Sequence, residues 1–397
     1  MAEIGEYKMT LAPGSYYEKA NLKDNPFRST PNFAADPRAK IWVGYEKQKK
    51  QLDKYLKRSL SDQVGNANFL MLYGDYGTGK SHALLWAQNR ILHDEKKSFD
   101  SVCYFIPTLQ KGKGKLTFAG AFLDDIIAKS DLMANVRAFQ NFLTESISHY
   151  RAAHNVELEV GPERIIEKLI HPVELNNFAK DIYHCQKEED FLRLVAPKAL
   201  TDYQAMIIFT RLVNLFVHEM KISETNVKRF KKGAYLFIDE LDDLERSSLK
   251  EAREVNDILR HIYDNCPNCF CMVIALSAEI SQLSVLFFDY ILSRIHRQIE
   301  LVVLDKDDSV AFVREILNSN RVNPDGEVGF FPFDETAIET IASQLTEITP
   351  RKIVTTMQQI IEEARLAGHD PADGPVSVEF LDENEILEEV LGEGGVA

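Results

Sequence analysis

Short apolar runs alternate along the chain with longer stretches of helical periodicity. Five runs of five to seven residues carry the aliphatic and aromatic side chains that buried strands favour: 69–73, 101–107, 234–238, 271–276 and 298–304. Between these runs, apolar residues recur every three or four positions, as they do in amphipathic helices. Apolar strands that alternate with helices predict an α/β fold, with a parallel sheet covered by helices on both faces.

One interval between two predicted strands is unusually long. Residues 109–230 exceed one crossover helix and its loops by about 60 to 80 residues. The excess has helical periodicity over 118–129, 132–149, 162–170, 173–183 and 201–220. We therefore expect a helical insertion that offers a binding surface to a partner protein. The alternative is that this segment only enlarges the core.

The remaining segments suggest a division of the chain into four parts. Residues 1–60 combine a turn-rich arm with an amphipathic helix over 47–59, and residues 61–305 contain all the predicted strands. Residues 306–370 show helical periodicity over 308–318, 334–345 and 350–366, which predicts a small helical domain. Residues 371–397 are expected to form an acidic C-terminal tail.

The stretch FLMLYGDYGTGKSHALL, residues 69–85, contains the strongest chemical signal. A predicted strand is followed by Gly74-x4-Gly79-Lys80-Ser81 and then by the start of a helix. This is the context of a phosphate-binding P-loop, in which glycines let backbone N–H groups turn inward around a phosphate. Lys80 is expected to reach the β- and γ-phosphate oxygens and Ser81 to bind Mg²⁺. The predicted nucleotide-binding positions are Gly74, Asp75, Tyr76, Gly77, Thr78, Gly79, Lys80, Ser81 and His82.

A second signal is the acidic pair that follows the predicted strand 234–238. Asp239 would lie at the carboxyl edge of the sheet, where it can bind Mg²⁺, and Glu240 beside it could polarise a water for attack on a γ-phosphate. An acidic cap on the following helix, formed by Asp242 and Asp243, is the structural alternative. Together with the P-loop, the pair predicts an ATPase that uses ATP and Mg²⁺.

Composition limits where in the cell the protein is expected. The 397 residues have an ordinary globular composition, and no run of roughly eighteen apolar residues or signal peptide is evident, so we expect no membrane contact and a cytoplasmic location. Five cysteines without framework spacing fit a reducing compartment. Cys266-x2-Cys269 lacks a second ligand pair at zinc-site spacing, which favours ordinary thiols.

Charge argues against a uniformly basic surface that coats nucleic acid, because the net charge is −15. One local cluster remains a candidate for DNA backbone contact: Lys111, Lys113 and Lys115 alternate with glycines and can approach phosphates closely. A flexible, solvated turn explains this cluster equally well.

The order of these motifs resembles that of the initiator-type AAA+ ATPases, which include origin-recognition ATPases, clamp loaders and transposition regulators. Asn25-Pro26-Phe27 and Val43-Gly44-Tyr45-Glu46 resemble segments that border the adenine pocket, although Tyr45 stands where arginine is usual. Phe237 to Asp242 closely resembles the acidic motif of the family. The resemblance implies a P-loop αβα sandwich with a helical lid, and a nucleotide-binding role for Val43 and Gly44.

Three further segments resemble AAA+ motifs by their order. Ser277 stands at the position of the first polar sensor, where asparagine is usual. Ser293-Arg294-Ile295 resembles the motif that carries an arginine finger, with Arg297 as a competitor in a helix expected over 288–297. A surface ion pair is the alternative role for Arg294. Pro350-Arg351-Lys352 resembles the second sensor, which implies that Arg351 touches the γ-phosphate from the same chain.

The sequence thus predicts a slow ATPase that assembles into homo-oligomers through Arg294. In one hypothesis it loads, recruits or regulates a partner protein on DNA. In the other it is a scaffold or signalling ATPase, as in a defence system, that activates an effector protein without contacting DNA. The acidic net charge favours the second hypothesis, and the Lys111 to Lys115 loop favours the first.

Overall fold

The computed structural model describes residues 15–27, 36–60, 67–93, 98–112, 114–266, 268–278, 282–326 and 328–392. The chain forms two compact units. We call residues 48–75 and 87–300 the core unit, and residues 1–47, 76–86 and 301–397 the lid unit. The P-loop crosses from one unit to the other, because its first two residues belong to the core unit and the others to the lid unit.

A five-stranded parallel sheet organises the core unit. Its order is β2 (Ser101–Ile106), β7 (Gly233–Ile238), β8 (Phe270–Leu276), β1 (Asn68–Tyr73) and β9 (Arg297–Glu300). The three inner strands are buried along their whole length, which explains their continuous apolar sequence. The predicted α/β fold with a parallel sheet is confirmed. The last strand is shorter than the apolar run 298–304, because β9 ends at Glu300.

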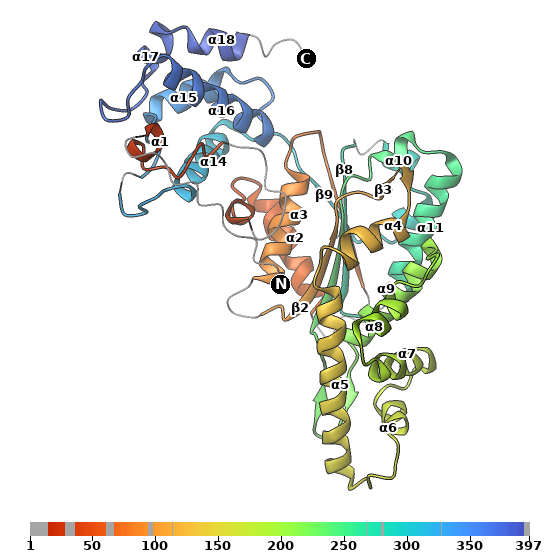
Figure 1. The fold of residues 1–397 in the computed structure, drawn as a ribbon. Helices are drawn as coiled ribbons and strands as arrows, with labels where there is room; N and C mark the ends of the chain where they lie inside the picture. Colours follow the sequence, from red (N-terminus) through yellow and green to blue (C-terminus); the bar gives the residue numbers. More distant parts are fainter. Residues whose placement is uncertain are drawn as a thin grey trace. The chain divides into compact units, whose positions relative to one another are not determined.

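Helices cover both faces of this sheet (Figure 1). On one face lies α2 (Glu46–Arg58), and the Tyr235 hydroxyl on β7 donates to the Leu56 carbonyl at 2.7 Å. On the other face lie α9 (Asp202–Phe216) and α11 (Leu249–Asn265). There Tyr104 on β2 packs edge-on against Phe209 of α9, with 5.9 Å between the ring centroids.

The long interval between β2 and β7 is helical, as predicted. It contains α4 (Phe118–Ala121), the π-helical turn η2 (Phe122–Ile127), α5 (Leu132–His154), α6 (Pro162–Leu169), α7 (Val173–His184), α8 (Glu188–Val195) and α9. Two short hairpins complete it: β3 (Gln110–Lys111) with β4 (Lys115–Leu116), and β5 (Met220–Lys221) with β6 (Val227–Lys228). Phe118 and Phe122 join the core on the sheet, and buried apolar residues of α5, α6 and α7 continue the same core. In Figure 1, α5 runs away from the sheet with α6 and α7 beside it. The insertion therefore enlarges the core and also projects beyond the sheet.

In the described part of the core unit, β7 is followed by the helices α10 (Asp243–Arg246), α11, α12 (Leu283–Leu286) and α13 (Asp289–Leu292). Ser248 and Glu251 form a reciprocal capping box at the start of α11. The helix expected over 288–297 is wrong in extent, because α13 ends at Leu292 and Arg297 already belongs to β9. Arg294 therefore lies in the connection between a short helix and an edge strand.

The lid unit consists of helices with their own apolar core. They are α14 (Lys306–Ser319), α15 (Glu335–Gln344), α16 (Pro350–Leu366), α17 (Val378–Glu383) and α18 (Ile386–Gly392). The segment expected as an acidic tail contains α17 and α18, which bury Leu381, Ile386 and Leu387 against α15 and α16. In the N-terminal arm, α1 (Tyr16–Lys19) and the 3-10 turn η1 (Pro37–Lys40) belong to the same unit. The Tyr17 hydroxyl donates to Glu362 of α16 and so fastens the arm to the lid.

Candidate nucleotide-binding site

The P-loop joins β1 to α3 (Lys80–Leu92) through a backbone that requires glycine. Gly74, Gly77 and Gly79 have φ values of 143°, 86° and 93°, a region that side chains with a β-carbon rarely adopt. A β-carbon on Gly77 would also lie 3.2 Å from Thr349 Oγ1 and 3.3 Å from Arg351 Cβ. Positive-φ glycines at this spacing form a concave loop of the kind that binds phosphate with backbone N–H groups.

The lysine and the serine of the motif, Lys80 and Ser81, are the first two residues of α3. Lys80 is the first helical residue and only 7% exposed, and Thr78 before it is 1% exposed, whereas Ser81 is exposed. The N-terminus of a helix and the N–H groups of the loop before it favour a phosphate group. Lys80 lies at this end of α3, which is the position that the P-loop motif gives to its lysine.

The acidic pair follows β7 at the carboxyl edge of the sheet. Asp239 is 6% exposed, its N–H donates to the Ile106 carbonyl, and its Oδ1 accepts the Glu240 N–H at 2.9 Å. Glu240 is exposed and has a φ of 50°, a left-handed conformation that costs a non-glycine residue about 1 to 3 kcal/mol. One carboxylate is thus buried and fixed, and the other is presented to solvent on a strained backbone. Gly74 and Asp239 follow strands of one parallel sheet, with only β8 between those strands.

Asp242 does not form the acidic helix cap that was the structural alternative. It stands before α10, but its side chain makes no capping hydrogen bond. Instead its Oδ1 accepts the N–H of Ser277, the residue that follows β8. The predicted sensor position is therefore fastened to the acidic motif through its backbone. The sequence identified Asp242 only as a member of the acidic motif, because its partner Ser277 follows a different strand.

The segment that precedes α2 is fastened to the second half of the P-loop within the lid unit. The Tyr45 hydroxyl lies 3.0 Å from the Thr78 carbonyl and 2.7 Å from the Val302 carbonyl, so it can donate its proton to either. Burial raises the pKa of Tyr45, which keeps this hydroxyl protonated. Gly44 and Tyr45 have positive φ values, and a β-carbon on Gly44 would lie 2.8 Å from Leu304 Cδ2.

One aromatic contact and one hydrogen bond extend the same arrangement along α3. The rings of Trp42 and Trp86 lie 4.9 Å apart between centroids. His82 Nε2 is hydrogen-bonded to the Ile41 carbonyl, and loss of solvent around the ring lowers the pKa of His82. The neutral imidazole therefore donates its Nε2 proton to that carbonyl. Val43, a predicted nucleotide contact, lies half-buried within this segment.

Arg351 lies against the P-loop at the start of α16. Thr349 caps this helix by accepting the Lys352 N–H at 3.2 Å, and Pro350 occupies its first position. The Arg351 N–H donates to the Gly77 carbonyl at 3.4 Å, and the Arg351 guanidinium lies 4.1 Å from the centroid of the Tyr76 ring. The structure thus brings together Tyr76, Gly77 and Arg351, all of which were predicted as site residues.

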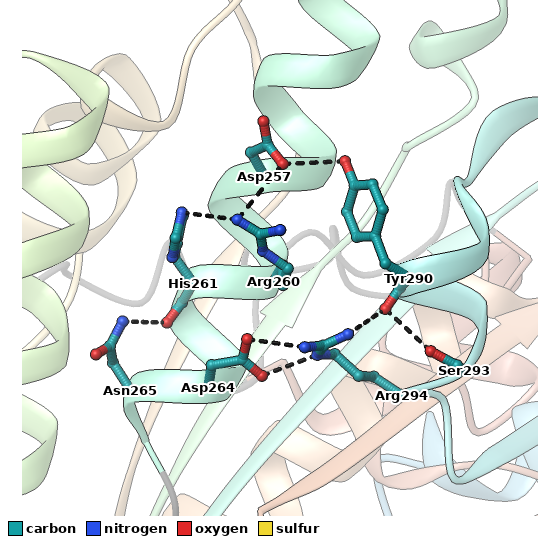
Figure 2. A network of polar contacts seen from close by, with 8 residues as sticks. All are labelled: Asp257, Arg260, His261, Asp264, Asn265, Tyr290, Ser293 and Arg294. Atoms are coloured by element: carbon teal, nitrogen blue, oxygen red, sulfur yellow. Dashed lines mark hydrogen bonds and ion pairs between the residues drawn. The ribbon is translucent and has the colours of Figure 1, made fainter.

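Arg294 is held by a carboxylate of its own chain (Figure 2). Its Nε and Nη2 donate to the two Asp264 oxygens at 2.8 and 3.0 Å, and Nη1 donates to the Tyr290 carbonyl at 2.6 Å. The hydrogen bond with Asp264 raises the pKa of Arg294. The ion pair that was the alternative role for Arg294 is therefore present. Arg297, its competitor, lies on β9 level with Leu70 of β1.

No protein-family model and no protein of curated function matches the sequence. Solved structures are similar in fold. The Aeropyrum pernix ORC2 protein in its ADP form superposes with a TM-score of 0.54 at 11% identity, over 94% of this chain and 73% of that chain. The same protein in ADPNP–ADP complexes gives 0.50 at 13% identity, over 95% and 73%. Drosophila ORC bound to DNA gives 0.50 at 10% identity, over 100% and 70%.

The chain shares its fold with these ORC structures. At such low identity the similarity concerns the fold alone. The roles of individual AAA+ site residues therefore rest on the motifs and contacts of this chain.

The lysine cluster predicted as a DNA contact differs from its expected form. Lys111 lies on β3, is only 16% exposed at its side chain, and places its Nζ 2.6 Å from Asp125 Oδ2. It also packs over Gly120, where a β-carbon would lie 3.0 Å from Lys111 Cγ. Lys111 is thus paired within its own chain, because the buried Asp125 on η2 binds its ammonium, and its contact with DNA stays a prediction. Lys115 is exposed, and Lys113 lies outside the described residues.

Neither a metal cluster nor a membrane span was found in the described part of the chain. No group of three or more His, Cys, Asp or Glu side chains there could hold a metal ion. Cys266, Cys269 and Cys271 are buried and form no disulfide, and burial raises the pKa of Cys271 to about 12. None of the described helices is both long and apolar enough to cross a bilayer.

Proposed function

We propose that this chain binds ATP with Mg²⁺, hydrolyses it slowly and uses the bound nucleotide to control its own assembly. The observation that carries the proposal is the loop from Gly74 to Ser81, which joins an inner strand to a helix that begins with the buried Lys80. The buried Asp239 follows another strand of the same sheet, at the same edge. An ammonium at a helix N-terminus can bind the phosphates of a nucleoside triphosphate, and a buried carboxylate can bind the metal that accompanies them.

Each site residue then has a defined task. Lys80 and the loop N–H groups bind the β- and γ-phosphates, and Val43 and Gly44 border the base. Mg²⁺, when bound, would be held by the Ser81 hydroxyl and the Asp239 carboxylate, and would neutralise charge on the phosphate oxygens. Glu240 accepts a proton from the attacking water, which its solvent-exposed position allows. Arg351 binds the γ-phosphate in its own chain, and Arg294 acts on the ATP of the neighbouring protomer.

Calorimetric titration with a non-hydrolysable ATP analogue and Mg²⁺ tests the site directly. Lys80→Ala should weaken binding about 10- to 100-fold, the range for a lost charged hydrogen bond. Glu240→Gln should bind the analogue like the wild type but hydrolyse ATP about 100- to 10,000-fold more slowly. Wild-type protein that binds no nucleotide, or a Lys80→Ala variant that binds it equally well, would refute the proposal.

The nucleotide-controlled assembly acts on a partner protein. It contacts this partner through the insertion 109–230 and loads, recruits or regulates it on DNA. Support for DNA comes from the fold, which is shared with Drosophila ORC, a structure described as bound to DNA. The alternative is a scaffold that activates an effector protein without DNA. The Lys111–Asp125 pair specifically favours this alternative, since it withdraws one lysine from the proposed DNA contact.

Mass photometry separates the two outputs. The protein is measured without nucleotide, with ADP and with the ATP analogue, each with and without a duplex of about 60 base pairs. Assembly that needs the ATP analogue and grows on DNA supports the loader, and Lys115→Glu should then reduce DNA binding. Assembly that needs the analogue but ignores DNA supports the scaffold. A monomer under every condition would contradict assembly and the role of Arg294 with it.

A further inference from the structure

Tyr76 places a large aromatic side chain in the phosphate-binding loop, at a position where the interior of the protein does not bury it. Its side chain is 72% exposed. Yet its ring lies under the Arg351 guanidinium, with the guanidinium carbon 4.1 Å from the ring centroid. Both residues belong to the lid unit, so this contact lies within one compact body. An exposed aromatic ring whose face is covered by a cation calls for a functional explanation.

The backbone fixes the two residues and leaves only their side chains to adjust. Gly77 follows Tyr76 with a φ of 86°, and its carbonyl accepts the Arg351 N–H at 3.4 Å. A β-carbon at Gly77 would be crowded, because it would lie 3.2 Å from Thr349 Oγ1 and 3.3 Å from Arg351 Cβ. The P-loop turn and the first turn of α16 are therefore in direct contact. The stack of ring and guanidinium follows from this contact.

Stacking leaves the hydrogen-bonding capacity of the arginine intact. A guanidinium lies flat on an aromatic ring and keeps its five N–H donors pointing outward in its own plane. A long arginine side chain otherwise samples many rotamers, and ordering it on binding is unfavourable. The ring therefore pre-orients Arg351 without using the groups that would contact a phosphate.

We propose that Tyr76 is a positioning residue that holds Arg351 ready for the terminal phosphate of a nucleoside triphosphate. It thereby increases discrimination of the triphosphate against the diphosphate, which lacks the group that Arg351 would contact. This inference rests on the proposed nucleotide site and adds a positioning group to it. It assigns to the π-face of Tyr76 a task distinct from the backbone contacts that the other loop residues make.

A double-mutant cycle tests the proposal. Dissociation constants for a non-hydrolysable ATP analogue and for ADP, both with Mg²⁺, are measured for the wild type, Tyr76→Leu, Arg351→Ala and the double variant. Tyr76→Leu should lower the affinity for the analogue relative to ADP about two- to fivefold, the range of an exposed cation–π contact. It should not lower this ratio further in the Arg351→Ala background. Tyr76→Phe is the matched control, because it keeps the ring and should keep the wild-type ratio.

Several results would overturn the inference. Equal losses for the analogue and ADP, or the same loss in the Arg351→Ala background, would mean that Tyr76 acts only through the shape of the loop. Tighter analogue binding by Tyr76→Leu would mean that the ring keeps the arginine away from the phosphate. Wild-type protein that binds neither nucleotide would refute the nucleotide site itself. A protein that binds both nucleotides but shows no coupling between Tyr76 and Arg351 would refute only the role of Tyr76. Thermal melting by circular dichroism confirms that each variant is folded.

Discussion

Replacing Asp264 with asparagine should release Arg294 from its own protomer. In the structure, two hydrogen bonds of 2.8 and 3.0 Å join the guanidinium to the Asp264 carboxylate, and the two side chains are 28% and 40% exposed. Solvent screens a pair at this exposure, so we assign it about 1 kcal/mol. Because 1.4 kcal/mol corresponds to a factor of ten in an equilibrium constant, loss of the pair should raise the ratio of released to paired Arg294 about fivefold. An arginine finger can contribute far more, about 1,000-fold or above, so assembly could readily break the pair.

The assay is steady-state ATP hydrolysis over protein concentrations that span assembly, which mass photometry measures in parallel. If Arg294 acts on a neighbouring ATP, Asp264→Asn should raise hydrolysis up to about fivefold where protein concentration limits assembly. Arg294→Ala should abolish the dependence of hydrolysis on concentration. Asp257→Asn is the matched control, because Asp257 lies on the same helix α11 but accepts from the Tyr290 hydroxyl at 3.0 Å and not from Arg294 (Figure 2).

Two results together would refute this reasoning. They are an Arg294→Ala variant whose hydrolysis still rises with concentration, and an Asp264→Asn variant that is unchanged or slower. Arg294 would then be a purely structural partner of Asp264. Arg297→Ala, measured in the same assay, would decide whether the neighbouring arginine takes the role instead.

Three further perturbations have expected outcomes. Gly77→Ala should lower the free energy of unfolding by about 1 to 2 kcal/mol and weaken nucleotide binding, because φ at Gly77 is 86°. Urea unfolding measures the first effect and calorimetry the second. A variant as stable as the wild type would contradict the strained turn. Tyr45→Phe should cost about 1 to 3 kcal/mol in urea unfolding, since it removes the hydroxyl beside the Thr78 and Val302 carbonyls; an unchanged midpoint would exclude that clamp. The pKa of His82 is lowered in the folded state, so the unfolded state binds more protons near neutral pH. The free energy of unfolding should therefore decrease as the pH falls below about 6.5, by at most about 1.4 kcal/mol per pH unit. Melting curves from pH 8 to 5.5 measure this slope, and His82→Gln should flatten it.

The sequence by itself determined the features that depend on neighbours along the chain. The inner strands are buried on both faces, so their apolar runs predicted a parallel sheet. The P-loop could be predicted because the strand, the glycines, Lys80 and the helix are contiguous. The helix predicted over 350–366 likewise begins at Pro350, where α16 begins.

Only the tertiary structure decided which partner each long polar side chain has. Lys111 binds Asp125, Arg294 binds Asp264, and Tyr45 reaches Val302, a residue 257 positions away. The acidic C-terminal residues form α17 and α18 because the helices beside them bury their few apolar side chains. Long side chains have many rotamers of similar energy, so packing between distant segments selects their contacts. The stack of Tyr76 on Arg351 arises in the same way, because the first turn of α16 lies against the P-loop only in the folded lid unit.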